Sequence, residues 1–360
     1  MTIHCAYSGV GGTGSFVSAL CPQLRHHYGA AERVVFYGVE PLHADYALCL
    51  KKAGVPFSEV SKRRGVDLRS YWALARTLTK IKAEVVVMHG GGTAWLWPLL
   101  RLMGVRGRLV LVEHGPESSL LRPGSFVRHT IGILCAQTVI AVSERLAERL
   151  RATFPAFLRS KPLWSIPNGV DTAFFAPPAR SRSLDTLLMV GTLSATKDHQ
   201  TLIRALAILA KERSVRLVFA GDGLLRSQLE QLAGECGVRE RVTFLGNVDR
   251  DHLLRLYREA AVFTFSTWGE GSPLSLLEAM SCGLPVVASD VPGVREILAG
   301  GECGIMVPPG QPAVMAQAIG RILAETEFAS CMGACARRRV ETNYSVEGMT
   351  ARYQAVLNAL

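Results

Sequence analysis

A rhythm of short apolar strands alternating with amphipathic helices runs through the chain, stops once and then restarts. The first series of strand candidates comprises residues 2–8, 33–39, 84–89, 108–113 and 138–142. The second series comprises residues 185–191, 215–220, 241–245, 262–266, 285–289 and 304–307. Such alternation is typical of parallel sheets covered by helices on both faces. The sequence therefore predicts an α/β protein with two doubly wound, Rossmann-like domains that face each other across a cleft.

The boundary between the two series is a turn-rich segment, Ile166-Pro167-Asn168-Gly169-Val170-Asp171. A chain of 360 residues is also too long for one compact core. We expect domains over residues 1–170 and 171–340, with a C-terminal helix over 341–360 that returns to the first domain. Gly333 and Asn343 are expected breaks within the helical tail.

Charge is unevenly distributed between the halves. Residues 1–170 hold 21 Lys and Arg against 10 Asp and Glu, a net +11, whereas residues 171–360 hold 19 against 20, a net −1; together they give the +10 of the whole chain. One interpretation is attraction of the basic half to an anionic membrane surface or an acidic acceptor. The other is a solvated basic face without a partner. Nucleic acid is not expected, because the basic runs lack interleaved aromatic residues and carry no recognition motif.

Apolar stretches are too short or too interrupted to span a bilayer, and the glycines of Gly9–Gly14 break any signal-peptide core. These features predict a cytoplasmic protein, with peripheral attachment to the inner face of the membrane as the option that the basic half leaves open. The nine cysteines are scattered singly without a Cys-x-x-Cys motif. We therefore expect free thiols and no zinc site.

Two acids, Glu270 and Glu278, flank a predicted helix start in the second half. Ser272 followed by Pro273 is typical of an N-cap and first helical position, which puts Glu278 nearly two turns into the helix. A helix N-terminus offers unpaired amides and partial positive charge to a phosphate. A carboxylate on either side of that site could hold sugar or ribose hydroxyls. The alternative is a capping cluster plus one buried, hydrogen-bonded glutamate.

The turn Gly9-Val10-Gly11-Gly12-Thr13-Gly14 follows the first strand and opens the first helix. It fits the G-x-G-x-x-G pattern of dinucleotide-binding loops, and Glu40 ends the second predicted strand where an acid could bind a ribose. This pattern supports an NAD(P)-dependent oxidoreductase as one hypothesis. A phosphate loop of another kind, or simple tight packing, explains the same glycines.

Polar residues follow several other predicted strands. Lys197 suits a diphosphate at a strand end, although it could equally be a surface lysine at a helix start. His114 could hydrogen-bond a substrate hydroxyl, or could have no special role. Asp222 could cap the following helix. Asp249 is an expected helix N-cap with Asp251 in the first turn, and no metal is expected there.

Together these motifs resemble the retaining glycosyltransferases of the GT-B architecture, family 4, also called glycosyl transferases group 1. The most specific part is Glu270-x7-Glu278 with the segment that follows it to Val287. Ile166–Asp171, Ala220–Gly223 and Lys197–Ile203 are further close matches. The resemblance is densest from residue 185 to 297 and weaker before 108.

The resemblance implies a metal-independent enzyme that needs no cofactor and moves a sugar from a nucleotide-sugar donor with retained configuration. A UDP-sugar is the favoured donor, and a glycan or lipid-linked acceptor in cell-surface polysaccharide or glycolipid synthesis is the implied partner. Residues 1–170 would bind the acceptor and residues 171–340 the donor. The implied catalytic residues are Glu270, His114 and Lys197. The implied donor-binding residues are Gly11, Gly12, Thr192, Lys197, Gly223, Val248, Glu270, Gly271, Ser272, Pro273, Leu274 and Glu278.

In this scheme Glu278 would bind the ribose, Glu270 would face the sugar, and Lys197 would neutralise the departing diphosphate. The sequence departs from the family at Thr192, where an arginine is common, and threonine supplies a hydroxyl but no charge. Two other enzyme classes stay open from sequence: the oxidoreductase, and a nucleotide-sugar epimerase of the same architecture.

Overall fold

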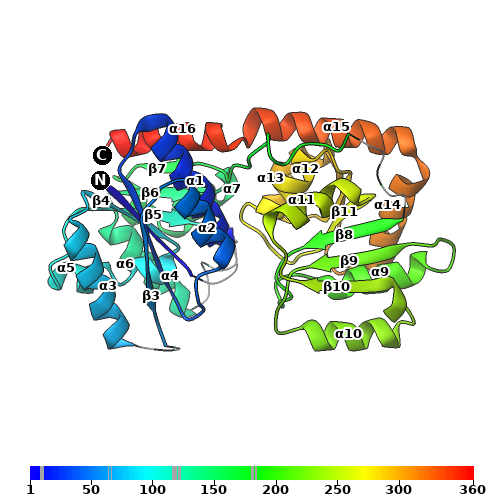
Figure 1. The fold of residues 1–360 in the computed structure, drawn as a ribbon, viewed down its shortest axis with the longest axis horizontal. Coiled ribbons are helices and arrows are strands. Elements are labelled where there is room, and N and C mark those ends of the chain that lie inside the picture. The colour runs from blue at the N-terminus through cyan, green and yellow to red at the C-terminus, as the bar shows by residue number, and fades with distance from the viewer. Residues whose placement is uncertain are drawn as a thin grey trace. The chain divides into compact units, whose positions relative to one another are not determined.

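The computed structural model describes residues 1–8, 12–63, 65, 67–115, 120, 123–179, 182 and 185–360. The chain divides into two compact units (Figure 1). Unit 1 comprises Met1–Gly169 together with Val346–Leu360, and unit 2 comprises Val170–Ser345. The first change of unit therefore falls inside the turn-rich segment Ile166–Asp171.

Unit 1 is built on a seven-stranded parallel sheet in the order β3-β2-β1-β4-β5-β6-β7. Its strands are β1 (Thr2–Ala6), β2 (Glu32–Gly38), β3 (Phe57–Ser61), β4 (Val85–His89), β5 (Arg108–Glu113), β6 (Thr138–Ala141) and β7 (Leu163–Ser165). Its helices are α1 (Gly12–Tyr28), α2 (Ala44–Lys52), α3 (Leu68–Ile81), α4 (Gly91–Ala94), α5 (Trp97–Leu102), α6 (Pro123–Cys135), α7 (Glu144–Thr153), α8 (Pro155–Leu158) and α16 (Val346–Asn358). The strand order reverses between β1 and β4, which makes this the switch point where such sheets bind ligands.

The sequence pattern does not reveal β3 and β7, the two edge strands of this sheet. In β3 only Val60 is buried, and β7 is three residues long with Trp164 largely exposed. Neither strand carries the continuous apolar run of a strand that is covered on both faces. The five central strands are all predicted.

Unit 2 has a six-stranded parallel sheet in the order β10-β9-β8-β11-β12-β13, with its switch point between β8 and β11. Its strands are β8 (Thr186–Val190), β9 (Arg216–Ala220), β10 (Val242–Gly246), β11 (Val262–Phe265), β12 (Val286–Ser289) and β13 (Ile305–Val307). Its helices are α9 (His199–Leu209), α10 (Arg226–Glu235), α11 (Arg250–Glu259), α12 (Leu274–Ser281), α13 (Pro292–Ile297), α14 (Pro312–Ala324) and α15 (Thr326–Asn343), with short 3₁₀ turns at Arg239–Arg241 and Ala299–Gly301. All six strands are predicted from the sequence.

Two apolar clusters hold unit 2 together, one on each face of its sheet. The first joins buried residues of α11, α12, α13 and α15, and the second joins those of α9, α10 and α14. Figure 1 shows α9 and α10 on one side of this sheet and α11, α12 and α13 on the other. A sheet covered on both faces leaves the ends of its strands as the open edge for ligands.

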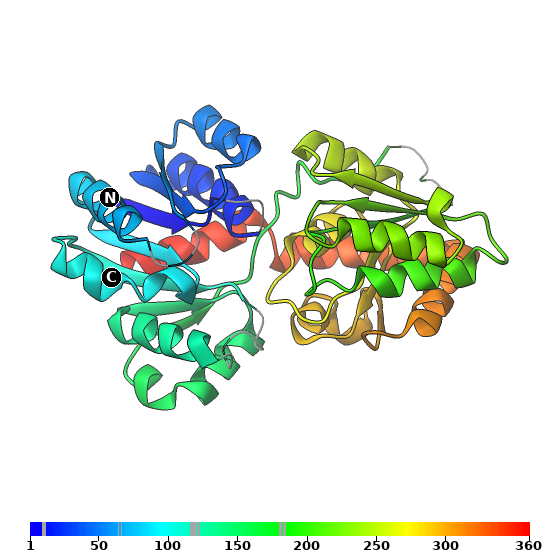
Figure 2. The ribbon, with the colours of Figure 1, turned by 90° about the horizontal axis from the view of Figure 1, so that it is seen from below.

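The chain returns to unit 1 through α16, which lies beside α1 (Figure 2). The buried ring of Tyr353 in α16 lies 5.7 Å from that of Phe16 in α1. The break expected at Gly333 is wrong, because Gly333 lies inside α15. A Cβ at this position would stand 2.3 Å from the Gly283 carbonyl oxygen, so the glycine serves the close approach of α15 to the end of α12.

Cys303 and Cys335 form a disulfide, so the expectation of nine free thiols is wrong for this pair. Their separation of 32 residues gave no sign in the sequence that α15 brings them together. The other seven cysteines are free. Among the described residues, no helix combines the length and the apolar character that crossing a bilayer demands.

Candidate active site

Two residues at the switch point of unit 2 make direct contact. Lys197 follows β8 and Glu270 follows β11, the two strands at which the order reverses. The ammonium group of Lys197 forms an ion pair with Oε1 of Glu270. The hydroxyl of Thr267 donates a hydrogen bond of 3.0 Å to the same oxygen. The structure thus brings together the predicted cation and the predicted sugar-side acid.

The backbone around Lys197 is tightly held. Lys197 pairs with Thr267 as an isolated antiparallel bridge, and its ammonium group lies 4.8 Å from the centre of the Phe265 ring. The next residue, Asp198, is buried and caps α9 by accepting a hydrogen bond from Thr201 N. Lys197 is therefore a half-buried residue of the strand-end loop rather than a surface residue at a helix start.

Asp198 ties this loop to two others. Its Oδ2 accepts a hydrogen bond of 3.2 Å from the Ser266 hydroxyl and another of 3.2 Å from the Gly310 amide. Because the carboxylate is buried, these bonds supply the partners that a desolvated charge needs. Sequence reasoning missed this role, since Asp198 looks like an ordinary N-cap.

The helix at Glu278 begins one residue later than predicted. α12 starts at Leu274, and Pro273 occupies the N-cap with φ −71° and ψ 115°. The prediction of Ser272 as N-cap is therefore wrong; proline fits here because its fixed φ suits the extended cap and its missing N–H is not needed. The N-cap makes no side-chain hydrogen bond to the first turn of α12, so among the described residues its first amides remain available to an anion. Gly271, Ser272 and Pro273 are buried, and Leu274 is half-buried.

Glu278 lies in the second turn of α12 and is held by a tyrosine from α11. The hydroxyl of Tyr257 donates to Glu278 Oε2 at 2.9 Å and also approaches Ser275 O at 3.1 Å. Burial raises the pKa of Glu278 to about 7, against the opposing effects of the Tyr257 hydrogen bond and the charge of Arg250. Glu278 Oε1 has no hydrogen-bond partner among the described residues. The acid is thus fixed at one oxygen and open at the other.

Glycines lock the loops after β8, β9 and β10 together. Gly221 has φ +139°, and a Cβ there would stand 2.2 Å from the Gly191 carbonyl oxygen. A Cβ on Gly223 would stand 2.4 Å from Leu193 O. The Gly221 amide also donates to Gly246 O at 2.8 Å. Gly223 therefore serves a close backbone contact within the site.

The remaining predicted residues of unit 2 divide by environment. Thr192 is exposed in the loop after β8, and Val248 packs half-buried against the core after β10. Asp249 caps α11 by accepting from His252 N at 2.7 Å, as predicted. Asp222 does not cap α10; its Oδ1 accepts from the adjacent Gly223 amide instead.

Gly293, near the start of α13, packs directly against the backbone of the loop that carries Glu270. A Cβ on Gly293 would stand 2.4 Å from Glu270 O and 2.5 Å from Gly271 O. Any larger residue would push the loop away from Lys197. Gly293, Thr267 and Tyr257 are supports of the site that sequence reasoning did not identify.

In unit 1, His114 follows β5 and joins a chain of histidines. Its Nε2 lies 2.9 Å from Nδ1 of His89, whose Nε2 lies 3.1 Å from Nδ1 of His4. Burial lowers the pKa of His114 to about 4 and the pKa of His89 well below its usual range. Both rings are therefore neutral at neutral pH.

The glycine loop of unit 1 is only partly described. Gly11 lies outside the described residues, and Gly12 is the first residue of α1. Glu40 was predicted to end the second strand. In the structure β2 ends at Gly38, so Glu40 lies two residues beyond the strand. The carbonyl oxygen of Glu40 accepts a hydrogen bond of 2.6 Å from the Ser8 hydroxyl.

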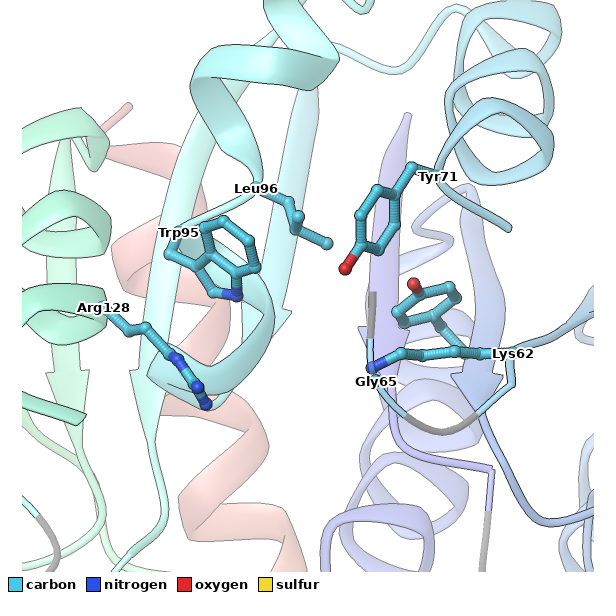
Figure 3. Close-up of a pocket in the computed structure, with 7 residues that line it drawn as sticks. Lys62, Gly65, Tyr71, Trp95, Leu96 and Arg128 are labelled. Carbon is cyan, nitrogen blue, oxygen red and sulfur yellow. The ribbon is translucent and has the colours of Figure 1, made fainter. Parts of the chain in front are cut away.

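A pocket of about 350 Å³ opens in unit 1 over the carboxyl ends of β2 and β3. Trp95, Leu96 and Arg128 stand on one side of it and Lys62 and Tyr71 on the other (Figure 3). Tyr37 and Gly65 complete the lining. The described lining has aromatic walls and two cations but no acid, which suits a ligand that combines a sugar-like face with negative charge.

Two family models match adjoining parts of this chain. The model described as glycosyl transferases group 1 matches residues 172–339, and that described as glycosyltransferase family 4 matches residues 10–174. Together they cover residues 10–339, which contain all the strands of both units except β1. The oxidoreductase hypothesis is not favoured by these matches.

Several curated relatives carry glycosyltransferase names. An uncharacterised glycosyltransferase of Methanocaldococcus jannaschii is 37% identical over 44% of this chain and 41% of its own length. The D-inositol 3-phosphate glycosyltransferase of Xylanimonas cellulosilytica is 28% identical over 84% of this chain and 74% of its own. The GDP-mannose-dependent alpha-(1-6)-phosphatidylinositol monomannoside mannosyltransferase of Mycolicibacterium smegmatis is 30% identical over 74% and 73%. The chain thus spans less than half of the first of these relatives but most of the other two.

Solved structures share the whole fold. The Anabaena protein HepE, solved with UDP and glucose, superposes with a TM-score of 0.83 at 18% identity over 100% of this chain and 99% of its own. Sucrose-phosphate synthase of Thermosynechococcus elongatus gives 0.84 at 21% identity over 100% of both chains. The architecture is therefore GT-B, as predicted. With both family models and a 30% identical relative in agreement, the chain belongs to the family 4, group 1 glycosyltransferases.

Proposed function

We propose that this glycosyltransferase moves a sugar from a nucleotide-sugar donor, with a UDP-sugar favoured, to a glycan or lipid-linked acceptor, and that the anomeric configuration is retained. The observation that carries the proposal is the Lys197–Glu270 pair at the switch point of unit 2, beside the uncapped start of α12. This arrangement puts a cation, free amides and a sugar-side acid at one strand edge.

In the proposed donor complex, Lys197 leaves Glu270 and approaches the diphosphate. Before the donor binds, the ion pair with Glu270 keeps the ammonium group of Lys197 in place. The first-turn amides of α12 hold a phosphate, and the open Oε1 of Glu278 accepts from a ribose hydroxyl. Charge aimed at the leaving group is often the largest catalytic contribution, so we assign departure of the nucleotide to Lys197.

We further propose that the leaving-group charge is offset by this cation and the helix start, without a metal. Asp249, the first acid of the Asp249-Arg250-Asp251 motif, is engaged as the cap of α11. Activity that survives EDTA fits this proposal, and a strict requirement for Mn²⁺ contradicts it.

The pocket of unit 1 supports an acceptor that carries negative charge. Trp95 and Tyr71 offer ring faces to a sugar, and Lys62 and Arg128 offer donors to a phosphate or carboxylate. Two of the relatives are named for phosphate-bearing inositol compounds. The positive charge of the first half of the chain would also attract the protein to an anionic membrane that holds a lipid-linked acceptor. Such an acceptor fits a role in the synthesis of surface polysaccharide or glycolipid.

A thermal-shift panel of UDP-, GDP- and ADP-sugars against NAD(H) and NADP(H) tests the donor class. The expected result is a rise in melting temperature with one nucleotide-sugar and none with the dinucleotides, because a ligand stabilises only the state that binds it. A shift with NAD(H) alone would sink the proposal. NMR of the product formed with acceptor then reports retention or inversion, and incubation of donor alone exposes an epimerase.

The acceptor pocket is tested with Arg128→Met and Lys62→Met, with Lys80→Met as a matched control. Lys80 is an exposed lysine of α3 outside the pocket. Each pocket variant is expected to raise the acceptor KM about 10-fold, the size of one lost charge-assisted hydrogen bond, while the donor KM stays constant. Equal acceptor KM values in all three variants would place the acceptor elsewhere.

A further inference from the structure

Three side chains of the kinds that bind metals meet inside unit 1, on the face of its sheet that α1 covers. His4 of β1 and Glu32 of β2 lie on the same face of neighbouring strands, because Glu32 pairs with Thr2, two residues from His4. Cys21 comes from α1, which packs on both strands. The donor atoms of the three side chains lie within 4.8 Å of one another, and all three residues are buried. An imidazole, a thiol and a carboxylate are the ligand types that zinc prefers.

Two of these donor atoms are buried without hydrogen bonds. Nε2 of His4 and Oε2 of Glu32 lie 2.9 Å apart, but neither atom has a hydrogen-bond partner among the described residues. Buried polar atoms nearly always have partners, and a bound ion is one way to supply them. A simple ion pair between the two residues is the alternative, but it leaves the thiol of Cys21 without a role. A metal ion would use all three groups.

The charges of this set favour a divalent cation. Glu32 is only 3% exposed, and its one ion-pair contact among the described residues is with His4. Burying a carboxylate is costly unless an opposite charge lies close by. A divalent cation bound by one carboxylate, one thiolate and one neutral imidazole has a net charge of zero. The bound ion would therefore offset the buried acid without leaving an excess charge in the core.

The thiol of Cys21 would bind as the thiolate. Burial, followed by the charges of Glu32 and Cys49, raises the pKa of Cys21 well above its usual range, so the thiol is protonated in the absence of a metal. A metal ion displaces this proton when the sulfur binds, and the proton leaves to solvent.

His4 also has the outer contact that is typical of a metal-bound histidine. Its Nδ1 lies 3.1 Å from Nε2 of His89. A histidine that binds a metal through one ring nitrogen normally donates a hydrogen bond from the other. His89 can accept that bond, because burial lowers its pKa well below the usual range and keeps its ring neutral.

We propose that His4, Cys21 and Glu32 form a structural zinc site that ties α1 to β1 and β2. The ion would be held by His4 Nε2, Cys21 Sγ and a carboxylate oxygen of Glu32. The sequence gives little sign of such a site, because the three ligands come from separate elements and include no paired-cysteine motif. None of these ligands has a part in the proposed sugar transfer, which is assigned to other residues.

The spacing of the donor atoms is close to that of zinc ligands. Nitrogen, oxygen and sulfur ligands of one tetrahedral zinc ion lie roughly 3.3–3.6 Å from one another. The 2.9 Å between the donor atoms of His4 and Glu32 is slightly shorter, and the distances to Cys21 Sγ are at most 4.8 Å. Side-chain shifts of roughly 1 Å would therefore close the three ligands on an ion. The fourth position would hold a water molecule, which keeps the net charge at zero.

The first test is a metal titration of the full chain. The protein is stripped with a chelator, dialysed and titrated with Zn²⁺ or Co²⁺ alone. We expect one tightly bound ion per chain and, with Co²⁺, a thiolate-to-metal charge-transfer band in the near ultraviolet. Cobalt that is bound only through nitrogen and oxygen gives no such band. A wild-type chain without the band therefore overturns the proposal.

The second test compares Cys21→Ser with Cys5→Ser as a matched control. Cys5 is another buried free cysteine of unit 1, and it follows His4 in β1, so its side chain points to the opposite face of the sheet. Cys21→Ser should lose the charge-transfer band, and Cys5→Ser should keep it. A band that persists in Cys21→Ser comes from an adventitious ion at another thiol and contradicts the assignment.

Thermal unfolding gives a readout that does not depend on the spectrum. Saturating Zn²⁺ should raise the Tm of the stripped wild type by roughly 5 °C, because the ion binds the folded state. Glu32→Gln, which lacks the carboxylate ligand, should show no rise. An equal rise in both proteins, or none in the wild type, would mean that zinc does not bind at this site.

These outcomes are separate from those that test the proposed function. A strict need for Mn²⁺ in sugar transfer contradicts the proposed function and does not bear on this site. Loss of activity in EDTA that Zn²⁺ restores, together with the Tm, supports the structural site instead. Since the wild-type titration needs no variant, misfolding of a variant does not rescue the proposal.

Discussion

The two units share one architecture but equip their switch points with opposite chemistry. Unit 1 sets the neutral imidazoles of His89 and His114 in contact, whereas unit 2 sets an ammonium group against the acid of Glu270. Neutral rings need no counter-charge, so they can be buried in series, while a charged pair must be held at the edge where a ligand can replace one partner. The neutral rings at the switch point of unit 1 suit hydroxyls, and the cation at the switch point of unit 2 suits a diphosphate.

Burial acts on both sets, but it moves the pKa values of their groups in opposite directions. It lowers the pKa of His114 to about 4 and raises the pKa of Glu278 to about 7, because in each case the charged form is disfavoured. The stability that depends on His114 is lost as pH falls from 6.5 towards 4. The stability that depends on Glu278 is present below about 4.5 and is lost as pH rises towards 7.

The largest expected effect comes from Lys197→Met, which removes the cation from the charged side of the comparison. We expect kcat to fall about 100- to 1000-fold, because a positioned charge on the leaving group is lost. Steady-state kinetics with a saturating acceptor measures it. Lys211→Met, at an exposed lysine just beyond α9, is the control. If both variants keep wild-type kcat, the charged pair is not catalytic.

The next effect is expected from Glu278→Gln, which should weaken donor binding about 10- to 100-fold through the loss of a charge-assisted hydrogen bond to the ribose. In the wild type, affinity should rise with pH through about 7, as Glu278 becomes the carboxylate that accepts best. Calorimetry from pH 6 to 8 checks both. Exposed Glu259→Gln is the control. A pH dependence that survives in Glu278→Gln belongs to another group.

A moderate effect is expected on the neutral side. His114→Gln removes a base that the unfolded chain protonates more readily than the folded one, so the loss of stability between pH 6.5 and 4 should shrink by up to about 3 kcal/mol. Thermal unfolding across this range, with exposed His26→Gln beside it, provides the measurement. An unchanged acid slope would mean that His114 is not held neutral by the fold.

The smallest effect is expected from Thr192→Arg, which adds a second cation to the charged side. Because position 192 is exposed, the gain in donor affinity should be about 2- to 5-fold and should fade with added salt. Thr192→Gln separates charge from size. Equal affinities for the two variants would show that position 192 does not face the diphosphate.

Much of the fold follows from the sequence because the central strands of both sheets are continuous apolar runs. The edge strands β3 and β7 do not, since their residues are largely exposed or too few to show a pattern. Gly333 shows a second limit: a helical glycine looks like a break until the Gly283 carbonyl is seen against it.

The site divides in the same way. Lys197 and Glu270 each end a strand, so their place at a sheet edge is predictable, but their contact depends on β8 and β11 being neighbours. Tyr257 is 21 residues from Glu278 on a different helix, and no local motif announces their hydrogen bond. Supports of this kind come from packing between elements, which residue spacing along the chain does not encode.

The glycine contacts among the loops after β8, β9 and β10 have a consequence for engineering. Gly221 and Gly223, in the loop after β9, lie very close to the carbonyl oxygens of Gly191 and Leu193 in the loop after β8. A change in the backbone conformation of either loop would therefore clash with the other. Grafting one of these loops alone from a relative would force such a clash with the loop beside it. The loops after β8, β9 and β10 form one packed unit, so a chimeric protein would have to exchange all three together.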